Sequence, residues 1–131
     1  MTDLPTAASV DVPASPAFVQ VLRNVVAGVA ARLDMPIDQI EDIRLAVTEA
    51  ASILLGEGDP TTLRMTNGRG DDTLDVTLTS DGHRSTRPSE RVMASWPWLV
   101  VKGLTDQLRA DQGDGAGPSI GFTKGRERVD R

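Results

Sequence analysis

Apolar side chains recur every three or four residues in two long stretches of the chain, a spacing that predicts two amphipathic helices. The first stretch begins at Ser15, a helix-capping residue followed by proline, and runs to about Leu33. The second begins at Asp38, where the spacing of Asp38 and Glu41 is typical of a capping box. It ends near Leu55, before a glycine. A proline between the two stretches separates the helices.

Shorter segments alternate apolar and polar side chains, which predicts β-strands. They cover residues 9–12, 61–66, 73–79, 108–111 and 119–123. The second and third flank a turn that begins at Asn67 and are expected to form a hairpin. Its inward-facing side chains are Leu74, Val76 and Leu78. With a short helix over 97–104, the order of elements predicts an α+β sandwich, in which helices cover one face of a mostly antiparallel sheet.

The chain has 131 residues, enough for one domain with a single hydrophobic core. Residues 1–7 and 125–131 are expected to be flexible tails, and 80–95 a loop. A net charge of −5 with scattered arginines argues against direct nucleic-acid binding, which needs clustered cations. There are no cysteines, so thiolate metal sites are excluded, and the single histidine, His83, leaves no basis for a histidine-rich zinc site. No signal peptide or membrane span is expected, and the expected location is cytoplasmic.

Glu49 lies on a second apolar face of the helix predicted over 38–55. With 100° per residue, one stripe of this helix carries isoleucine, valine and alanine side chains, which is the usual core-facing side. On the opposite side, Leu45, Glu49 and Ile53 line up at i, i+4 spacing, where charged side chains are usual. An acid between two branched apolar side chains indicates a partly closed environment, such as a ligand pocket or a partner surface.

Three segments carry a resemblance to a known family. The stretch from Asp42 to Ala50, Asp-Ile-Arg-Leu-Ala-Val-Thr-Glu-Ala, resembles the N-box helix of the anti-sigma factor and serine-protein kinase family. The helix before it is similar to the family's first helix, and residues 98–106 are similar to the segment that ends in Leu-x-Asp. The likeness covers nearly the whole chain in the expected order. It implies the Bergerat (GHKL, histidine kinase-like ATPase) fold, a two-layer α/β sandwich.

The resemblance also assigns roles to particular residues. It implies that Glu49 is the catalytic base and that Asp81 contacts the adenine ring of ATP. Family members that bind ATP have an Asn four residues after the Glu, which helps to hold Mg²⁺. Here that nucleotide-site position is Ile53, which offers no oxygen to a hard cation.

Glycines of two nucleotide-binding boxes are replaced as well. In the adenine box, Asp81 is followed by His83 and Ser85 where the family has glycines, and the Gly-x-Gly of the phosphate lid appears as Ser95 to Pro97. Proline removes a backbone donor, and neither lid residue permits the positive φ that glycine adopts. The chain most resembles a variant subgroup with a degraded ATP site. That subgroup implies no metal and no cofactor, whereas ATP and Mg²⁺ belong to the alternative of an active enzyme.

Other interpretations of these residues stay open. Glu49 is also explained as an acid on a helix surface, and Asp81 as part of an Asp-Gly turn after a strand. Trp98 is expected to be buried, whereas Trp96 is either a core residue or an anchor in an interface.

Taken together, the resemblance implies an anti-sigma factor-like regulatory protein. Such a protein sequesters an RNA polymerase sigma factor, is released by an anti-anti-sigma factor, and forms a homodimer without contacting nucleic acid or membrane. The alternative is an active ATP-dependent serine-protein kinase that phosphorylates its anti-anti-sigma partner. A third interpretation is a regulatory module of a two-component or stress pathway that binds another partner.

Overall fold

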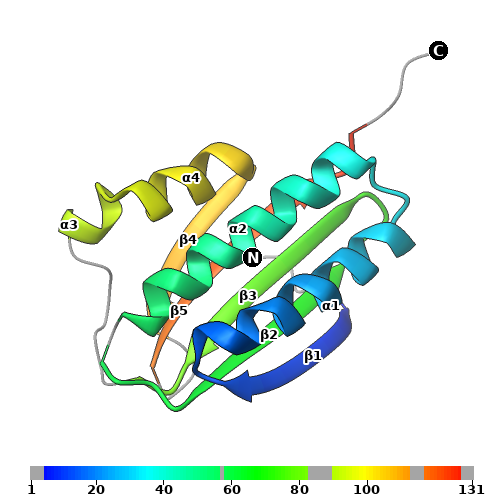
Figure 1. Cartoon of the computed structure of the whole chain (residues 1–131). Coiled ribbons are helices and arrows are strands. Elements are labelled where there is room, and N and C mark those ends of the chain that lie inside the picture. Colours follow the sequence, from blue (N-terminus) through cyan, green and yellow to red (C-terminus); the bar gives the residue numbers. More distant parts are fainter. Residues whose placement is uncertain (1–4, 57, 83–89, 113–116, 128–131) are drawn as a thin grey trace.

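Helices and strands form two layers in the computed structural model, which describes residues 5–56, 58–82, 90–112 and 117–127. The strands are β1 (Thr6–Pro13), β2 (Thr62–Arg69), β3 (Thr73–Ser80), β4 (Gln107–Gln112) and β5 (Pro118–Gly125). The helices are α1 (Val19–Arg32), α2 (Ile37–Leu55), α3 (Glu90–Met93) and α4 (Trp96–Leu104), and a 3-10 turn over Pro16–Phe18 precedes α1. All strand pairs are antiparallel, in the order β1-β2-β3-β5-β4. The helices lie in front of the sheet in Figure 1, which confirms the predicted α+β sandwich.

The core lies between the sheet and the helices. Leu74, Val76 and Leu78 of β3 are fully buried, as the alternation along this strand predicts. The helices contribute Leu22, Val26, Ile43, Val47 and Leu54, and the other strands contribute Leu63, Met65, Ile120 and Phe122. None of the helices in the described part of the chain has both the length and the hydrophobicity needed to cross a lipid bilayer.

Helix α2 begins one residue before the predicted start, and its predicted capping box is not formed. The N-cap is Pro36, which makes no side-chain cap hydrogen bond, and Asp38 lies in the first turn. Pro36 holds an extended backbone (φ −60°, ψ 153°) and so already sets where the helix begins. The carboxylate of Asp38 still lies near the positive end of the helix dipole. Asp38 is therefore a first-turn acid and not a cap.

The hairpin between β2 and β3 is longer than predicted. Asn67, the expected start of the turn, pairs with Val76 of β3 and with Ala8 of β1. Because β2 has a neighbour on both sides, its ladder continues to Arg69 through residues whose type favours a turn. The Asn67 side chain is fully buried, and neither its oxygen nor its nitrogen has a hydrogen-bond partner among the described residues.

Two further segments differ from their predicted form. A short helix, α3, lies within the residues 80–95 that were expected to be a loop, of which 83–89 are outside the described residues. Strand β1 begins at Thr6, inside the segment 1–7 expected to be a tail, because pairing with β2 extends to Gly68.

The end of β5 is attached to the start of α2. Gln39 Nε2 donates a hydrogen bond to the Gly125 carbonyl at 2.9 Å, and its Oε1 accepts one from the Glu127 N–H at 2.8 Å. Arg126 donates to the Leu33 carbonyl at 3.2 Å. The first residues of the expected C-terminal tail therefore contact the helix layer.

Candidate functional site

Glu49 and Ile53 lie one turn apart on α2, beside the buried stripe of this helix. Both side chains are half-buried and Ile53 packs against the core, whereas Leu45, one turn earlier, is 45% exposed. Helix α4 packs against α2 and lies next to it in Figure 1. The second apolar face predicted for this helix is therefore enclosed only in part, around Glu49 and Ile53.

Asp81, at the end of β3, is bonded to the backbone where β2 begins. Its Oδ1 accepts hydrogen bonds from the N–H groups of Thr61 at 2.7 Å and Thr62 at 3.0 Å, and its Oδ2 accepts one from the Thr61 hydroxyl. The hydroxyl of Thr61, followed by these two N–H groups, holds the pKa of Asp81 below its usual range. The carboxylate therefore holds together the ends of two neighbouring strands.

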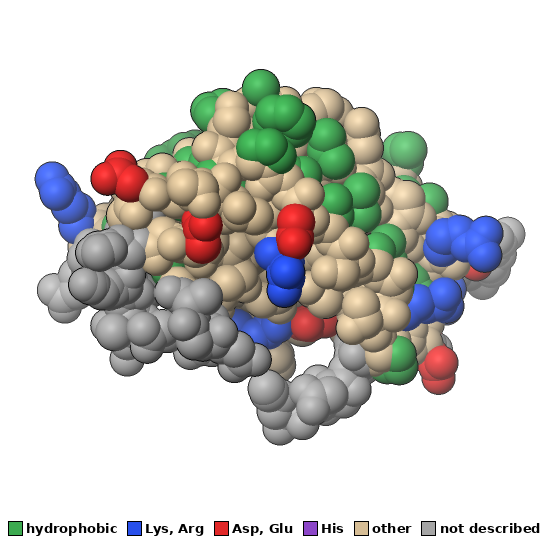
Figure 2. Space-filling model, turned by 90° about the horizontal axis from the view of Figure 1, so that it is seen from below, with side chains coloured by type: hydrophobic (Ala, Val, Ile, Leu, Met, Phe, Trp, Pro, Cys, Tyr) green, Lys and Arg blue, Asp and Glu red, His purple; other side chains and the backbone are tan. Residues whose placement is uncertain are grey.

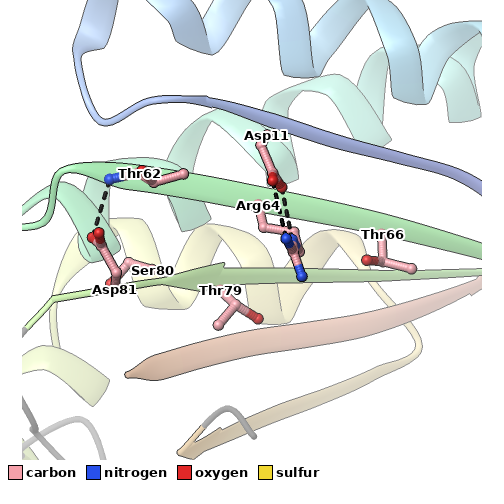
Figure 3. Close-up of a pocket in the computed structure, with 7 residues that line it drawn as sticks. All are labelled: Asp11, Thr62, Arg64, Thr66, Thr79, Ser80 and Asp81. Atoms are coloured by element: carbon pink, nitrogen blue, oxygen red, sulfur yellow. Dashed lines mark hydrogen bonds and ion pairs between the residues drawn. The ribbon is translucent and has the colours of Figure 1, made fainter. Parts of the chain in front are cut away.

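Asp81 also lines a shallow polar hollow of about 420 Å³. The other lining residues are Asp11, Thr62, Arg64, Thr66, Thr79 and Ser80, drawn in Figure 3. Along β2, the residues Thr62, Arg64 and Thr66 alternate with buried apolar side chains, so they lie on the open face of the sheet, away from the helices. Neither Glu49 nor Ile53 lines this hollow. Two of the three candidate site residues therefore lie on α2, and the third belongs to a different group.

An ion pair crosses the open face between β1 and β2. Arg64 Nε donates to Asp11 Oδ1 at 2.7 Å and Nη2 to Oδ2 at 3.0 Å, and the two side chains face each other in Figure 3. The hydrogen bond from Arg64 lowers the pKa of Asp11, and the bond to Asp11 raises the pKa of Arg64. Such a two-point pair aligns the side chains, but exposure to water limits its contribution to stability.

A second arginine crosses the same face from β4. Arg109 Nη2 lies 2.9 and 3.1 Å from the two carboxylate oxygens of Asp75 and 3.2 Å from the hydroxyl oxygen of Thr77. Gly121 of β5 is the register partner of both Arg109 and Thr77. A Cβ at Gly121 would lie only 2.7 Å from the guanidinium carbon, so the absent side chain leaves the space that Arg109 occupies.

Two arginines on the open face, Arg64 and Arg109, are each paired with an acid. Figure 2, which views the molecule from below, shows acidic and basic side chains close to one another on that side. A phosphate group is best bound by unpaired cations or by the backbone donors of a helix start, and the hollow is lined by strand residues. In the part of the chain that the structure describes, no group of three or more His, Asp or Glu side chains could hold a metal ion.

Ile53 and Pro97, which the resemblance assigns to a nucleotide site, lack groups that would bind Mg²⁺ or phosphate there. Ile53 is apolar and packs against the core, and the carboxylate of Asp81 accepts three hydrogen bonds from its own chain. Pro97 lies in the first turn of α4 and has no N–H to donate to a phosphate. His83 and Ser85 lie outside the described residues.

The two tryptophans have different environments. Trp98 is only 8% exposed and belongs to the core, which confirms its predicted burial. Trp96, two residues earlier, is 75% exposed, so of its two interpretations the core residue is wrong. Ser95 is the N-cap of α4 but makes no side-chain cap hydrogen bond.

Asp11 and Arg64, which lie beside Asp81 in the hollow, were missed by the sequence reasoning. The alternation along β2 does mark Arg64 as an outward-facing residue. The pairing of Arg64 with Asp11 depends on the register of β1 against β2, which places the two residues opposite each other. Neither strand contains a local signal for that register.

Comparison with known proteins adds no family to this geometry. A scan against models of known protein families finds no match to the chain, and a search of curated proteins finds no similar sequence. Membership of the anti-sigma factor family is therefore a proposal.

Proposed function

We propose that this protein is a regulatory binding protein of the anti-sigma type, with the Bergerat fold and a nucleotide site that has degenerated. On this proposal it sequesters an RNA polymerase sigma factor and releases it when an anti-anti-sigma factor binds. A homodimer is part of the same proposal. Its function then depends on protein surfaces and needs no chemical step.

The bonding of Asp81 is the observation that supports the proposal most strongly. A carboxylate offers about four lone-pair positions, and three of those of Asp81 already accept hydrogen bonds from within the chain. Both oxygens of Asp81 accept hydrogen bonds from Thr61 or Thr62, and the residue lies with Asp11 and Arg64 around the hollow. Asp81 therefore joins the end of β3 to the start of β2, and this structural role needs no nucleotide.

Ile53 adds support from the helix layer. Phosphoryl transfer depends on a metal ion that neutralises the phosphates and on a base that activates the nucleophile. Glu49 is a carboxylate of the right type for the base, but the half-buried side chain one turn later has no oxygen for a metal. A catalytic base that lacks this metal ligand supports a protein that kept the kinase fold but not the kinase activity.

Reconstitution with sigma factors tests this function directly. The full chain would be mixed with each sigma factor of its native host, produced separately, and the mixtures resolved by size-exclusion chromatography. We expect a stable complex with at least one sigma factor, formed without ATP and dissociated by the cognate anti-anti-sigma factor. A known anti-sigma pair run under the same conditions is the control. If that pair stays together and no sigma factor is retained by this chain, the proposal is wrong.

A further inference from the structure

Strand β1 is an edge strand, and no strand of the described residues pairs with its outer side. The Ala14 N–H donates to the Thr61 carbonyl at 2.9 Å, which fixes the phase of the antiparallel ladder. Every second residue from Ala14 back to Val10 therefore bonds to β2. The N–H and C=O groups of Ser9 and Asp11, which lie between these residues, point away from β2. Two donors and two acceptors of the backbone thus face outwards from this edge.

A row of apolar side chains lies on α1 beside this edge. Phe18, just before α1, and Val21 and Val25 follow i, i+3, i+7 spacing next to the buried stripe that contains Leu22 and Val26. Because α1 runs from left to right in Figure 1, with the sheet behind it and α2 above it, its right-handed turn places the row on the lower side. Figure 2 views that side and shows hydrophobic side chains gathered there. Phe18 is 41% and Val21 39% exposed, so the row is only partly covered.

The surface formed by the row and the edge carries almost no net charge. Residues 12–31 contain one charged residue, Arg23, although a quarter of the whole chain is charged. Arg23 donates to the side chain of Gln20 at 3.2 Å. On the edge itself, Asp11 is paired with Arg64. Depletion of charged residues is typical of the centre of an interface. In a protein with a net charge of −5, a neutral surface of this kind is one through which identical copies can meet without repulsion.

The position of α1 over the sheet fits a second copy at this edge. Helix α1 packs on β1 and β2. Neighbouring strands lie about 4.8 Å apart, so pairing two β1 strands along their outer edges would place the two α1 axes about 10 Å apart. Packed helices lie about 8–10 Å apart. The strand pairing that satisfies the edge therefore also brings the two apolar rows into contact.

We propose that β1 pairs antiparallel with β1 of a second copy of this chain, so that the two sheets become continuous and the two α1 helices pack against each other. The inference rests on the homodimer that the proposed function includes, and it names the surface of that dimer. Its test involves no sigma factor, so the dimer can fail while sigma binding holds, and the reverse.

The backbone of β1 selects one register for this pairing. With Val10 on the two-fold axis, Ser9 of each copy lies opposite Asp11 of the other, and the pair exchanges all four outward groups. With Asp11 on the axis, two aspartates would face each other, and Pro13 would have no N–H to donate. With Ser9 on the axis, pairing would have to extend into the irregular part of β1 over residues 6–8.

Disulfide formation tests this register in the full chain, which has no cysteine of its own. On the axis, the two Val10 Cα atoms form a non-hydrogen-bonded pair about 4.5 Å apart, within the range that a disulfide spans. Ala8→Cys is the matched control. Four residues of strand would separate its two copies, about 14 Å, which a disulfide cannot span. We expect Val10→Cys to form a reducible covalent dimer under mild oxidation, and Ala8→Cys to form none.

Sedimentation equilibrium tests the same surface without a cross-link. Val21→Lys places a charge in the apolar row, and α1 contains no acid that could pair with it. Ser9→Pro removes an outward N–H and leaves the ladder to β2 intact. Leu45→Lys, at a similarly exposed apolar residue of α2, is the matched control. We expect the first two changes to weaken dimerisation about tenfold or more and the control to leave it unchanged.

Thermal unfolding of each variant at a concentration where the chain is monomeric shows that it is folded. Equal cross-linking of both cysteine variants, or a dimer that neither Val21→Lys nor Ser9→Pro weakens, would place the contact elsewhere and overturn the proposal. An unchanged chain that sediments as a monomer at about 100 μM would overturn it as well, and would leave this edge to the strand of another protein.

Discussion

Thr62 and Asp81 join the start of β2 to the end of β3 through a 3.0 Å hydrogen bond from the Thr62 N–H to Asp81 Oδ1. The Thr61 N–H donates to the same oxygen at 2.7 Å. At a strand end, where the ladder stops, these N–H groups would otherwise need water or another partner. Asp81 therefore has a role in the fold that needs no nucleotide.

Replacing Asp81 by asparagine should lower the free energy of unfolding by about 1 kcal/mol at neutral pH, the scale of charge-assisted hydrogen bonds reduced by exposure to water. The pKa of Asp81 is lowered in the folded state, chiefly by the Thr61 hydroxyl. A lowered pKa gives stabilisation that is complete above the carboxyl's ordinary pKa of about 3.9 and is lost as the pH falls through the lowered value. Urea unfolding of both proteins between about pH 2 and pH 7 measures this dependence.

Asp71→Asn, a change at an exposed acid, is the matched control and should alter stability little at any pH. A deficit of Asp81→Asn that stays constant down to about pH 2 would show that the ionised carboxylate is not the source of the stabilisation.

Gly117→Ala should be strongly destabilising. A Cβ at this position would lie 2.3 Å from the Ser80 carbonyl oxygen and 2.8 Å from that of Gly82, and both obstacles are backbone atoms that cannot rotate away. We expect a loss of roughly 2–3 kcal/mol. Gly28→Ala in α1, where a Cβ meets nothing within 4 Å, should instead gain up to about 1 kcal/mol. Thermal unfolding compares the two, and a similar effect of both changes would contradict the close approach at Gly117.

Gly121→Ala should act through Arg109. The new methyl group would displace the guanidinium from its position over β5 and weaken its bonds to Asp75. Because that ion pair is exposed, we expect a loss below about 1 kcal/mol. With Arg109→Ala already present, the loss should disappear. A double-mutant cycle on the free energy of unfolding measures this coupling, and strictly additive effects would mean that the two residues are independent.

Asn67→Leu should stabilise the protein. The Asn67 amide is buried with no hydrogen-bond partner among the described residues, and an unpaired buried polar group costs about 1–3 kcal/mol. An apolar side chain of similar size removes that cost, so we expect a gain of about 1–2 kcal/mol in chemical denaturation. Asn24→Leu, at an exposed position of α1, is the control and should change stability little. A loss of stability in Asn67→Leu would reveal that the amide is satisfied in solution.

Local patterns were sufficient to predict most of the elements. Leu74, Val76 and Leu78 alternate without interruption, and the structure buries all three. Predicted strand ends were wrong where pairing with neighbouring strands extends a strand through residues whose type favours a turn. Asn67 looks like a turn residue, but β2 has a neighbouring strand on each side and its ladder continues past it.

The candidate site was less accessible to sequence reasoning, because its contacts join residues far apart in the chain. Asp81 could be singled out from its own motif, but its bonds to Thr61 and Thr62 depend on how β2 and β3 pair. Arg109 reaches Asp75 only because Gly121 lies between them in the register. A strand pattern specifies which way a side chain faces, and the register decides what it meets.

Isothermal titration of the purified full chain with ATP in the presence of Mg²⁺ tests the central claim most directly. An ATP-binding member of the anti-sigma kinase family, titrated under the same conditions, is the positive control. We expect this chain to release no heat of binding at millimolar nucleotide while the control binds. Saturable binding of ATP by this chain at micromolar concentration would contradict that claim.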